Sequence, residues 1–202
     1  MAATSEAPAY EARRGVSARS ITLAVLIVAV TAAVLLWMGR APICDCGVVK
    51  LWHGAVVSSE NSQHIADWYT PSHILHGLVF YAFLWWVLRR STLGTRLVIA
   101  TAIEAAWEVA ENTDAVIERY REATIALDYY GDSVVNSVAD IAWMWVGFAL
   151  ARVLPVRASI ALFVIAELVV GALIRDGLTL NVVMLLAPQD WIRDWQSAGG
   201  LL

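Results

Sequence analysis

Carboxylates set between long apolar segments constrain this chain more than any other feature. Residues 103–140 hold nine of its 18 acidic residues, and both ends of this stretch run into strongly apolar sequence. A charged side chain at mid-membrane costs roughly 2.5–3.5 kcal/mol on insertion scales, so such residues face the interior of a bundle, pair with one another or meet water. The fold must therefore turn these carboxylates away from lipid.

The apolar segments themselves are typical of membrane helices, which need about 20 residues to cross a hydrocarbon core of ~30 Å. We expect spans at residues 21–38, 72–88, 97–112, 132–154 and 159–174. The chain is 59% hydrophobic and only 16% charged, whereas soluble domains carry about 25% charged residues. These features predict an all-α fold, a polytopic membrane helix bundle of about five transmembrane helices.

The predicted bundle covers residues 21–176, with a long polar and aromatic loop at 39–70. Residues 1–20 are polar, which predicts a disordered cytoplasmic tail. A signal peptide is the alternative for residues 21–38, but this run is longer than the usual h-region of 7–15 residues and no convincing cleavage site follows.

The third helix is expected to continue beyond the membrane as an amphipathic helix to Arg121. Residues 177–202 contain an apolar run too short to span, followed by Trp191 and Trp195 one helical turn apart. Tryptophan favours the headgroup region, so we expect an interfacial C-terminal segment.

Lysine and arginine determine the predicted orientation, because these residues collect on the cytoplasmic side. With the N-terminus inside, eight of the 14 basic residues lie inside and six outside, and the inside charges sit tight against span ends. We therefore expect a multi-pass protein of the bacterial inner membrane with its N-terminus in the cytoplasm and loop 39–70 outside. The net charge of −4 and the lack of a basic patch argue against nucleic acid as a partner.

Three of the predicted spans carry ionisable or amide side chains at helical spacing near their outer ends. They are His73 and His76; Glu104, Glu108 and Glu111; and Asp132, Asn136 and Asp140. Spacings of three, four, seven and eight residues place the members of each group on one helix face. Glu104 and Asp140 lie deeper, closer to mid-membrane. The predicted catalytic set is His73, His76, Glu108, Glu111, Asp132 and Asn136.

Three kinds of chemistry fit this set. Five of its members, His73, His76, Glu108, Glu111 and Asp132, are suitable ligands for a divalent metal such as Zn, Mn or Fe. The same residues could perform general acid–base hydrolysis or relay protons in a transporter. Asn136 and the carboxylates could also simply hold helices together. The chain contains no HExxH, GxGxxG, Walker A or GxSxG motif that would decide between these chemistries.

The two cysteines, Cys44 and Cys46, lie in the loop predicted to be outside, where disulfides are permitted. A disulfide across one residue closes a tight ring and is expected to be strained. Metal binding and free thiols are the alternatives. Glu167 stands alone in the fifth span, and structural pairing and function are equally compatible with it.

The chain, including the loop ENSQHIADWYTPSHILHG, resembles an uncharacterised family of bacterial inner-membrane proteins known as a domain of unknown function. A looser resemblance links residues 104–112, Arg119, Arg121 and the spaced acidic and amide residues 128–140 to the VanZ-like group of small bacterial membrane proteins. That second resemblance implies a connection with the cell envelope.

The leading functional hypothesis is an inner-membrane protein with a polar His/carboxylate site at the periplasmic face, acting on a lipid-linked or envelope substrate. In this hypothesis His73 and His76 are ligands or base, Glu108 and Glu111 are ligands or acid, and Asp132 and Asn136 orient them. A transporter or proton-coupled protein without catalysis and a structural assembly factor are the alternatives. Five spans are few for a monomeric transporter, which would then have to form an oligomer.

Overall fold

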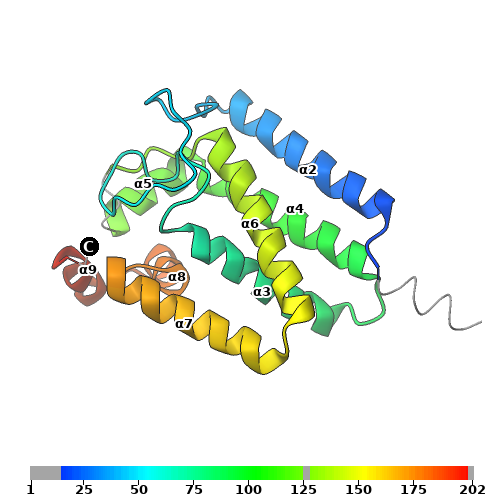
Figure 1. Cartoon of the computed structure of the whole chain (residues 1–202). Coiled ribbons are helices and arrows are strands. Elements are labelled where there is room, and N and C mark those ends of the chain that lie inside the picture. The colour runs from blue at the N-terminus through cyan, green and yellow to red at the C-terminus, as the bar shows by residue number, and fades with distance from the viewer. Residues whose placement is uncertain (1–14, 125–127, 200–202) are drawn as a thin grey trace, which may run out of the picture.

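The computed structural model describes residues 15–124 and 128–199, and within these ranges the chain folds into eight α-helices without a strand (Figure 1). The helices are α2 (Ala18–Trp37), α3 (Thr70–Val87), α4 (Leu93–Glu111), α5 (Asp114–Ala123), α6 (Val134–Val153), α7 (Val156–Ile174), α8 (Leu178–Leu186) and α9 (Asp190–Ser197). The predicted all-α class is confirmed. The predicted spans correspond to α2, α3, α4, α6 and α7, with ends that differ by up to four residues.

Hydroxyl side chains begin three of the five long helices. The Oγ atoms of Ser17 and Ser133 and the Oγ1 atom of Thr92 each accept a hydrogen bond from the backbone N–H three residues later, at 3.0–3.2 Å. These bonds satisfy N–H groups that otherwise lack a partner in the first helical turn. Prolines begin the other two long helices: Pro71 occupies the first turn of α3, and Pro155 precedes α7.

The expected continuation of the third helix to Arg121 is wrong. Helix α4 ends at Glu111, and a separate helix α5 begins at Asp114. Thr113 adopts an extended conformation between them. Asn112 directs its side chain into the bundle to pair with Asp132, which fixes the break at the C-terminal end of α4.

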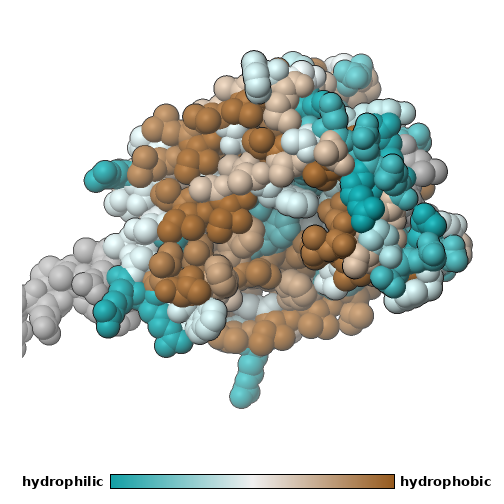
Figure 2. Space-filling view, turned by 180° about the vertical axis from the view of Figure 1, so that it is seen from behind, coloured by the Kyte–Doolittle hydropathy of each residue, from teal (hydrophilic) through white to brown (hydrophobic). Residues whose placement is uncertain are grey.

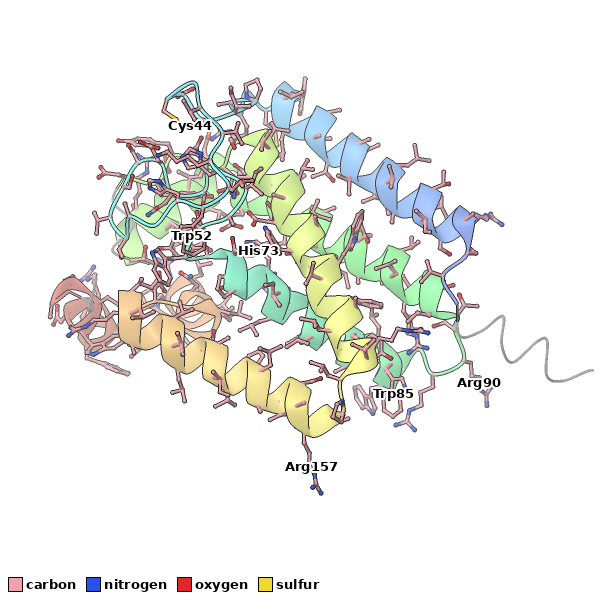
Figure 3. The ribbon with its side chains drawn as sticks, viewed as in Figure 1. Cys44, Trp52, His73, Trp85, Arg90 and Arg157 are labelled. Carbon is pink, nitrogen blue, oxygen red and sulfur yellow. A yellow bond between two sulfur atoms is a disulfide. The ribbon has the colours of Figure 1, made fainter. Side chains whose placement is uncertain are left out.

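The five long helices run alternately in opposite directions, so that their connections gather at two ends (Figure 1). The loop end carries residues 38–69, α5, α8 and α9. The arginine end carries the α3–α4 and α6–α7 connections, with Arg89, Arg90, Arg96, Arg152 and Arg157. Figure 3 shows Trp85, Arg90 and Arg157 at the arginine end, and Cys44 and Trp52 at the loop end.

The core lies between α3, α4 and α6, around Ile141, Met144 and Phe148. Outside it, α2 and α7 are strongly apolar yet mostly exposed, with only three and two buried residues. Helices α2, α6 and α7 are long and apolar enough to cross a membrane. Figure 2 shows a hydrophobic surface across the middle of the molecule, with hydrophilic residues gathered towards the loop end. An apolar surface of this extent is typical of contact with lipid.

The terminal segments fall partly outside the described residues. Residues 1–14 of the predicted disordered tail 1–20 lie outside them, and Ala18–Ser20 belong to α2 because Ser17 caps that helix. The C-terminal segment forms α8 and α9 at the loop end. Helix α9 exposes Trp191 and Trp195, the two residues on which the interfacial prediction rests.

Candidate functional site

A close crossing of α3 and α6 creates the site. A Cβ atom on Gly77 would lie 2.1 Å from the Met144 carbonyl oxygen, and one on Gly147 would lie 1.9 Å from the Ile74 carbonyl oxygen. Only glycine permits the two backbones to approach this closely. The crossing brings the first turns of α3, which carry His73 and His76, against Asp140 on α6.

Glu104 of α4 lies between the two histidines. Its Oε1 atom is 2.8 Å from His73 Nδ1 and 3.0 Å from His76 Nδ1, and Glu104 is completely buried. A carboxylate only accepts hydrogen bonds, so we assign the proton of both histidines to Nδ1. This leaves both Nε2 atoms as acceptors, and His73 Nε2 lies 3.7 Å from Asp140 Oδ2. A carboxylate that fixes a histidine tautomer in this way is the usual arrangement behind a metal-binding imidazole.

Glu108, one turn after Glu104, is also completely buried. Neither of its carboxylate oxygens has a hydrogen-bond partner among the described residues, and the nearest histidine nitrogen, His73 Nδ1, is 3.6 Å away. Buried carboxylates are normally paired or bound to metal, because desolvation of an unpaired charge is costly. His73 is within ion-pair distance of Glu108, but its Nδ1 atom makes its hydrogen bond to Glu104, so both oxygens of Glu108 stay without a hydrogen-bond donor among the described residues.

Two groups of potential ligand atoms share Glu108. His73, Glu108 and Asp140 offer atoms that all lie within 4.8 Å of one another, and the same limit holds for Glu108, Glu111 and Asp132. His73, His76 and Glu104 form a third group. These clusters contain the donor types that first-row divalent metals bind, namely imidazole nitrogen and carboxylate oxygen.

Neutral donors hold the carboxylates of the second group. Asp132 accepts hydrogen bonds from Asn112 Nδ2 at 2.8 Å and from the Tyr129 hydroxyl at 2.9 Å, and its own N–H donates to Asn112 Oδ1 at 2.7 Å. The Tyr120 hydroxyl hydrogen-bonds Glu111. These contacts orient the carboxylates without neutralising them.

Lysine and arginine do not supply the missing positive charge. Arg40, Lys50 and Arg193 form ion pairs with Asp114, Glu60 and Asp190, all outside the cluster. The cluster therefore combines five carboxylates, on Glu104, Glu108, Glu111, Asp132 and Asp140, with two histidines. Such a charge balance favours binding of a cation.

A pocket of about 180 Å³ leads from the cluster to the loop end. His73, His76, Glu111, Asp132 and Asp140 line its inner wall, while Glu104 and Glu108 lie behind them. Loop residues near Val56 and Ser62, the rings of Tyr69, Trp107, Tyr120 and Tyr129, and α8 form the remaining wall. Figure 3 shows His73 in the interior near the start of α3.

Asp176 forms part of the pocket wall where α7 meets α8. The carboxylate is buried, accepts a hydrogen bond from the Tyr69 hydroxyl at 3.3 Å and contacts Gln196 of α9 at 3.3 Å. Burial raises the pKa of Asp176 to about 7. The contact joins the C-terminal segment to the start of α3 beside the pocket.

The two histidines of the loop between α2 and α3 belong to a different cluster. His64 Nε2 lies 3.0 Å from Glu60 Oε2, and Lys50 forms an ion pair with the same carboxylate. These two partners lower the pKa of Glu60 to about 2. The His53 ring lies beside the His64 ring, with centroids 5.1 Å apart and the planes tilted by 45°. His53 and His64 therefore organise the loop and do not line the pocket.

Cys44 and Cys46 form a disulfide in this structure. Glu60 and His64 lie close enough to complete a metal-binding group with the two sulfurs. However, His64 Nδ1 accepts a hydrogen bond from the Lys50 N–H, so its single proton lies on Nε2 and points at Glu60. That tautomer opposes metal binding at Nε2, and the disulfide is the arrangement that the loop supports.

Asn136 is the predicted site residue that the fold directs elsewhere. Its Nδ2 atom donates to the His64 carbonyl at 2.8 Å, which ties the loop between α2 and α3 to α6, while its Oδ1 atom is buried without a hydrogen-bond partner among the described residues. In its place, the cluster contains Glu104, Asp140 and Asn112. Glu104 and Asp140 continue the helical spacing of Glu108 and Asp132, so the sequence already indicated that they lie on the same helix faces as these residues. The role of Asn112 depends on the break between α4 and α5, which no spacing in the sequence indicates.

Glu167 has a structural role. Its two carboxylate oxygens accept hydrogen bonds from the N–H groups of Leu178 and Thr179, at 3.1 and 2.9 Å. These are unpaired donors of the first turn of α8, so Glu167 caps that helix from a neighbouring one.

Comparison with known proteins places this architecture in a family. Residues 35–198 match the family described as "Protein of unknown function (DUF2585)". A UPF0314 protein of Paracoccus denitrificans is 62% identical over 173 residues, which cover 86% of this chain and 90% of the relative. A UPF0314 protein of Sphingopyxis alaskensis is 48% identical over 185 residues, covering 92% and 98%.

A third relative, a UPF0314 protein of Sinorhizobium fredii, is 56% identical over 160 residues, which cover 79% of this chain and 81% of the relative. No solved structure matches the chain. The looser resemblance to the VanZ-like group stays a prediction. The match over most of its length shows that the chain belongs to the DUF2585 family, whose curated members are called UPF0314 proteins.

Proposed function

We propose that this protein is a membrane enzyme with a divalent metal centre, acting on a lipid-linked or envelope substrate at the periplasmic face. The observation that carries the proposal is Glu108, whose completely buried carboxylate has no hydrogen-bond partner among the described residues and lies beside His73 and Asp140. A bound cation gives this carboxylate the partner that it lacks.

The membrane arrangement that we propose has five spans, α2, α3, α4, α6 and α7. Helices α3 and α4 contain 18 and 19 residues and lie within the same bundle as the three strongly apolar helices. The concentration of arginines at one end favours that end as cytoplasmic. The N-terminus of α2 packs beside Gly94 at the start of α4 and shares that side. The pocket then opens at the periplasmic end, in the inner membrane.

We assign the first metal ion to His73 Nε2, Glu108 and Asp140. One imidazole and two carboxylates suit Zn, Mn or Fe in the divalent state. A metal bound here supplies a Lewis acid that polarises a carbonyl or phosphoryl oxygen. Glu104 keeps the proton of His73 on Nδ1 and so presents Nε2 to the metal.

His76 is positioned for proton transfer. Glu104 fixes its Nδ1 proton through contacts of 3.0 Å from both carboxylate oxygens, and its ring reaches the pocket wall. Its neutral Nε2 can therefore accept a proton from a water or hydroxyl group in the pocket. The pocket wall also includes Val182 and Leu185 of α8, which suits a substrate with an apolar part.

The test is a deletion of the gene in a bacterium that carries it, followed by mass spectrometry of its lipid extracts. We expect a lipid-linked species that accumulates in the deletion strain and in a strain with Glu108→Gln, and that wild-type protein removes. Equal lipid profiles in all strains, with normal amounts of protein in the membrane, would overturn the enzymatic proposal. That result would favour the transporter or structural alternatives.

A further inference from the structure

We infer that the site holds two cations, with Glu108 as the ligand that they share. The inference rests on the proposed function for its first metal ion and adds a second site, made by Glu108, Glu111 and Asp132. The ligand atoms of this second group lie within 4.8 Å of one another, as do those of the first group.

The two carboxylate oxygens of Glu108 provide the first argument. Both are completely buried, and neither has a hydrogen-bond partner within the described part of the chain. A single ion bound through one oxygen would leave the other buried and unpaired. Glu108 belongs to both ligand groups, one with Asp140 and the other with Asp132. If an ion occupies each group, the Glu108 carboxylate bridges the two ions and each of its oxygens has a partner.

Charge provides the second argument. Apart from Glu104, which the histidines hold, the two ligand groups contain four carboxylates, on Glu108, Glu111, Asp132 and Asp140. The pocket wall contains no lysine or arginine among the described residues. When all four carboxylates are ionised, one divalent ion balances only two of their charges, whereas two ions balance all four. Metal centres with two ions about 3.5–4 Å apart commonly share a carboxylate in this way.

Ligand type distinguishes the two positions. The first group includes an imidazole, while the second offers only carboxylate oxygens. Oxygen ligands alone favour hard cations such as Mg²⁺ or Mn²⁺. The hydrogen bonds from Asn112, Tyr129 and Tyr120 hold Asp132 and Glu111 in place, and they occupy one lone pair of each oxygen that they touch.

The experiment is a titration of detergent-solubilised protein with Mn²⁺ after removal of bound metal, followed by electron paramagnetic resonance. We expect two Mn²⁺ ions per chain and the exchange-coupled spectrum of a close pair. Asp132→Asn and Glu111→Gln should each bind one ion and lose the coupling, while Glu108→Gln should bind neither ion tightly. Asp128→Asn is the matched control, because this carboxylate lines the same pocket outside both groups and should leave two coupled ions.

One uncoupled ion in the wild type would overturn the second site and leave the first intact. No ion in the wild type would overturn the inference and the metal centre of the proposed function together. Two coupled ions in both Asp132→Asn and Glu111→Gln would show that the second ion uses other ligands, contrary to the inference. If Asp132→Asn fails to fold because it disturbs the contact with Asn112, Glu111→Gln decides alone.

Discussion

Replacement of Glu108 with glutamine separates metal binding from structural pairing. The substitution keeps the side-chain volume and removes the charge of a completely buried carboxylate that has no hydrogen-bond partner among the described residues. If the carboxylate binds metal, the variant loses the stabilisation that metal confers. If the carboxylate serves only the fold, the variant should respond to metal as the wild type does.

The magnitude follows from linkage. A ligand at 100 times its dissociation constant stabilises the folded state by about 2.7 kcal/mol. For a chain of 150–250 residues, each kcal/mol raises the melting temperature by about 2–4 °C. Metal should therefore raise the melting temperature of the wild type by roughly 5–10 °C over protein in chelator. In chelator, Glu108→Gln should melt no lower than the wild type, because a buried charge without compensation has been removed.

The assay is thermal unfolding of solubilised protein, with Mn²⁺ or Zn²⁺ added to one sample and chelator to the other. Glu118→Gln is the matched control, since Glu118 is an exposed carboxylate on α5 and should keep the full metal response. A metal response in Glu108→Gln equal to that of the wild type would refute the reasoning. A variant that melts far below the wild type even in chelator would instead show that Glu108 supports the fold.

Three further predictions concern the surrounding structure. Gly147→Ala should lower the free energy of unfolding by about 3 kcal/mol or more, because its Cβ would meet the Ile74 backbone. The control Gly171→Ala has open space around it and should not destabilise the protein. Unfolding in denaturant measures both changes. The raised pKa of Asp176, which Tyr69 and Glu167 face, means that its contribution to stability is present near pH 4 and lost as pH rises through about 7. The melting temperature of the wild type relative to Asp176→Asn should therefore fall between about pH 4 and 7 and level off above that, and a constant difference would contradict the burial argument. In a cysteine-free background, an impermeant thiol reagent should label Ser58→Cys in intact spheroplasts, and labelling of Ser91→Cys there would reverse the proposed orientation.

The helix faces could be predicted because they depend on local spacing. The intervals between Glu104 and Glu108, and between Asp132 and Asp140, place each pair on one side of a helix whatever the rest of the chain does. Long apolar segments and the cost of unpaired backbone groups in lipid leave helices as the accessible structure. The residues that approach one another at the inner wall of the pocket follow from these two facts.

Contacts between distant segments could not be predicted in the same way. Asn136 bonds the backbone of His64, 72 residues earlier, because the outer loop folds over the start of α6. Glu167 caps a helix that begins eleven residues later, and Asn112 turns inward only because α4 stops there. Each of these roles depends on the path of a loop, for which the sequence carries no periodic signal.

Metal content of the purified wild-type protein tests the central claim most directly. The protein is extracted from membranes of cells grown with adequate metal, purified through a tag that does not bind metal, and analysed for its elements after gel filtration. We predict at least one tightly held divalent transition-metal ion per chain, absent from Glu108→Gln prepared in parallel and retained in Glu118→Gln. Wild-type protein that is folded yet contains no more metal than Glu108→Gln, and gains none on addition of Mn²⁺ or Zn²⁺, would contradict the claim that this buried cluster is a metal centre.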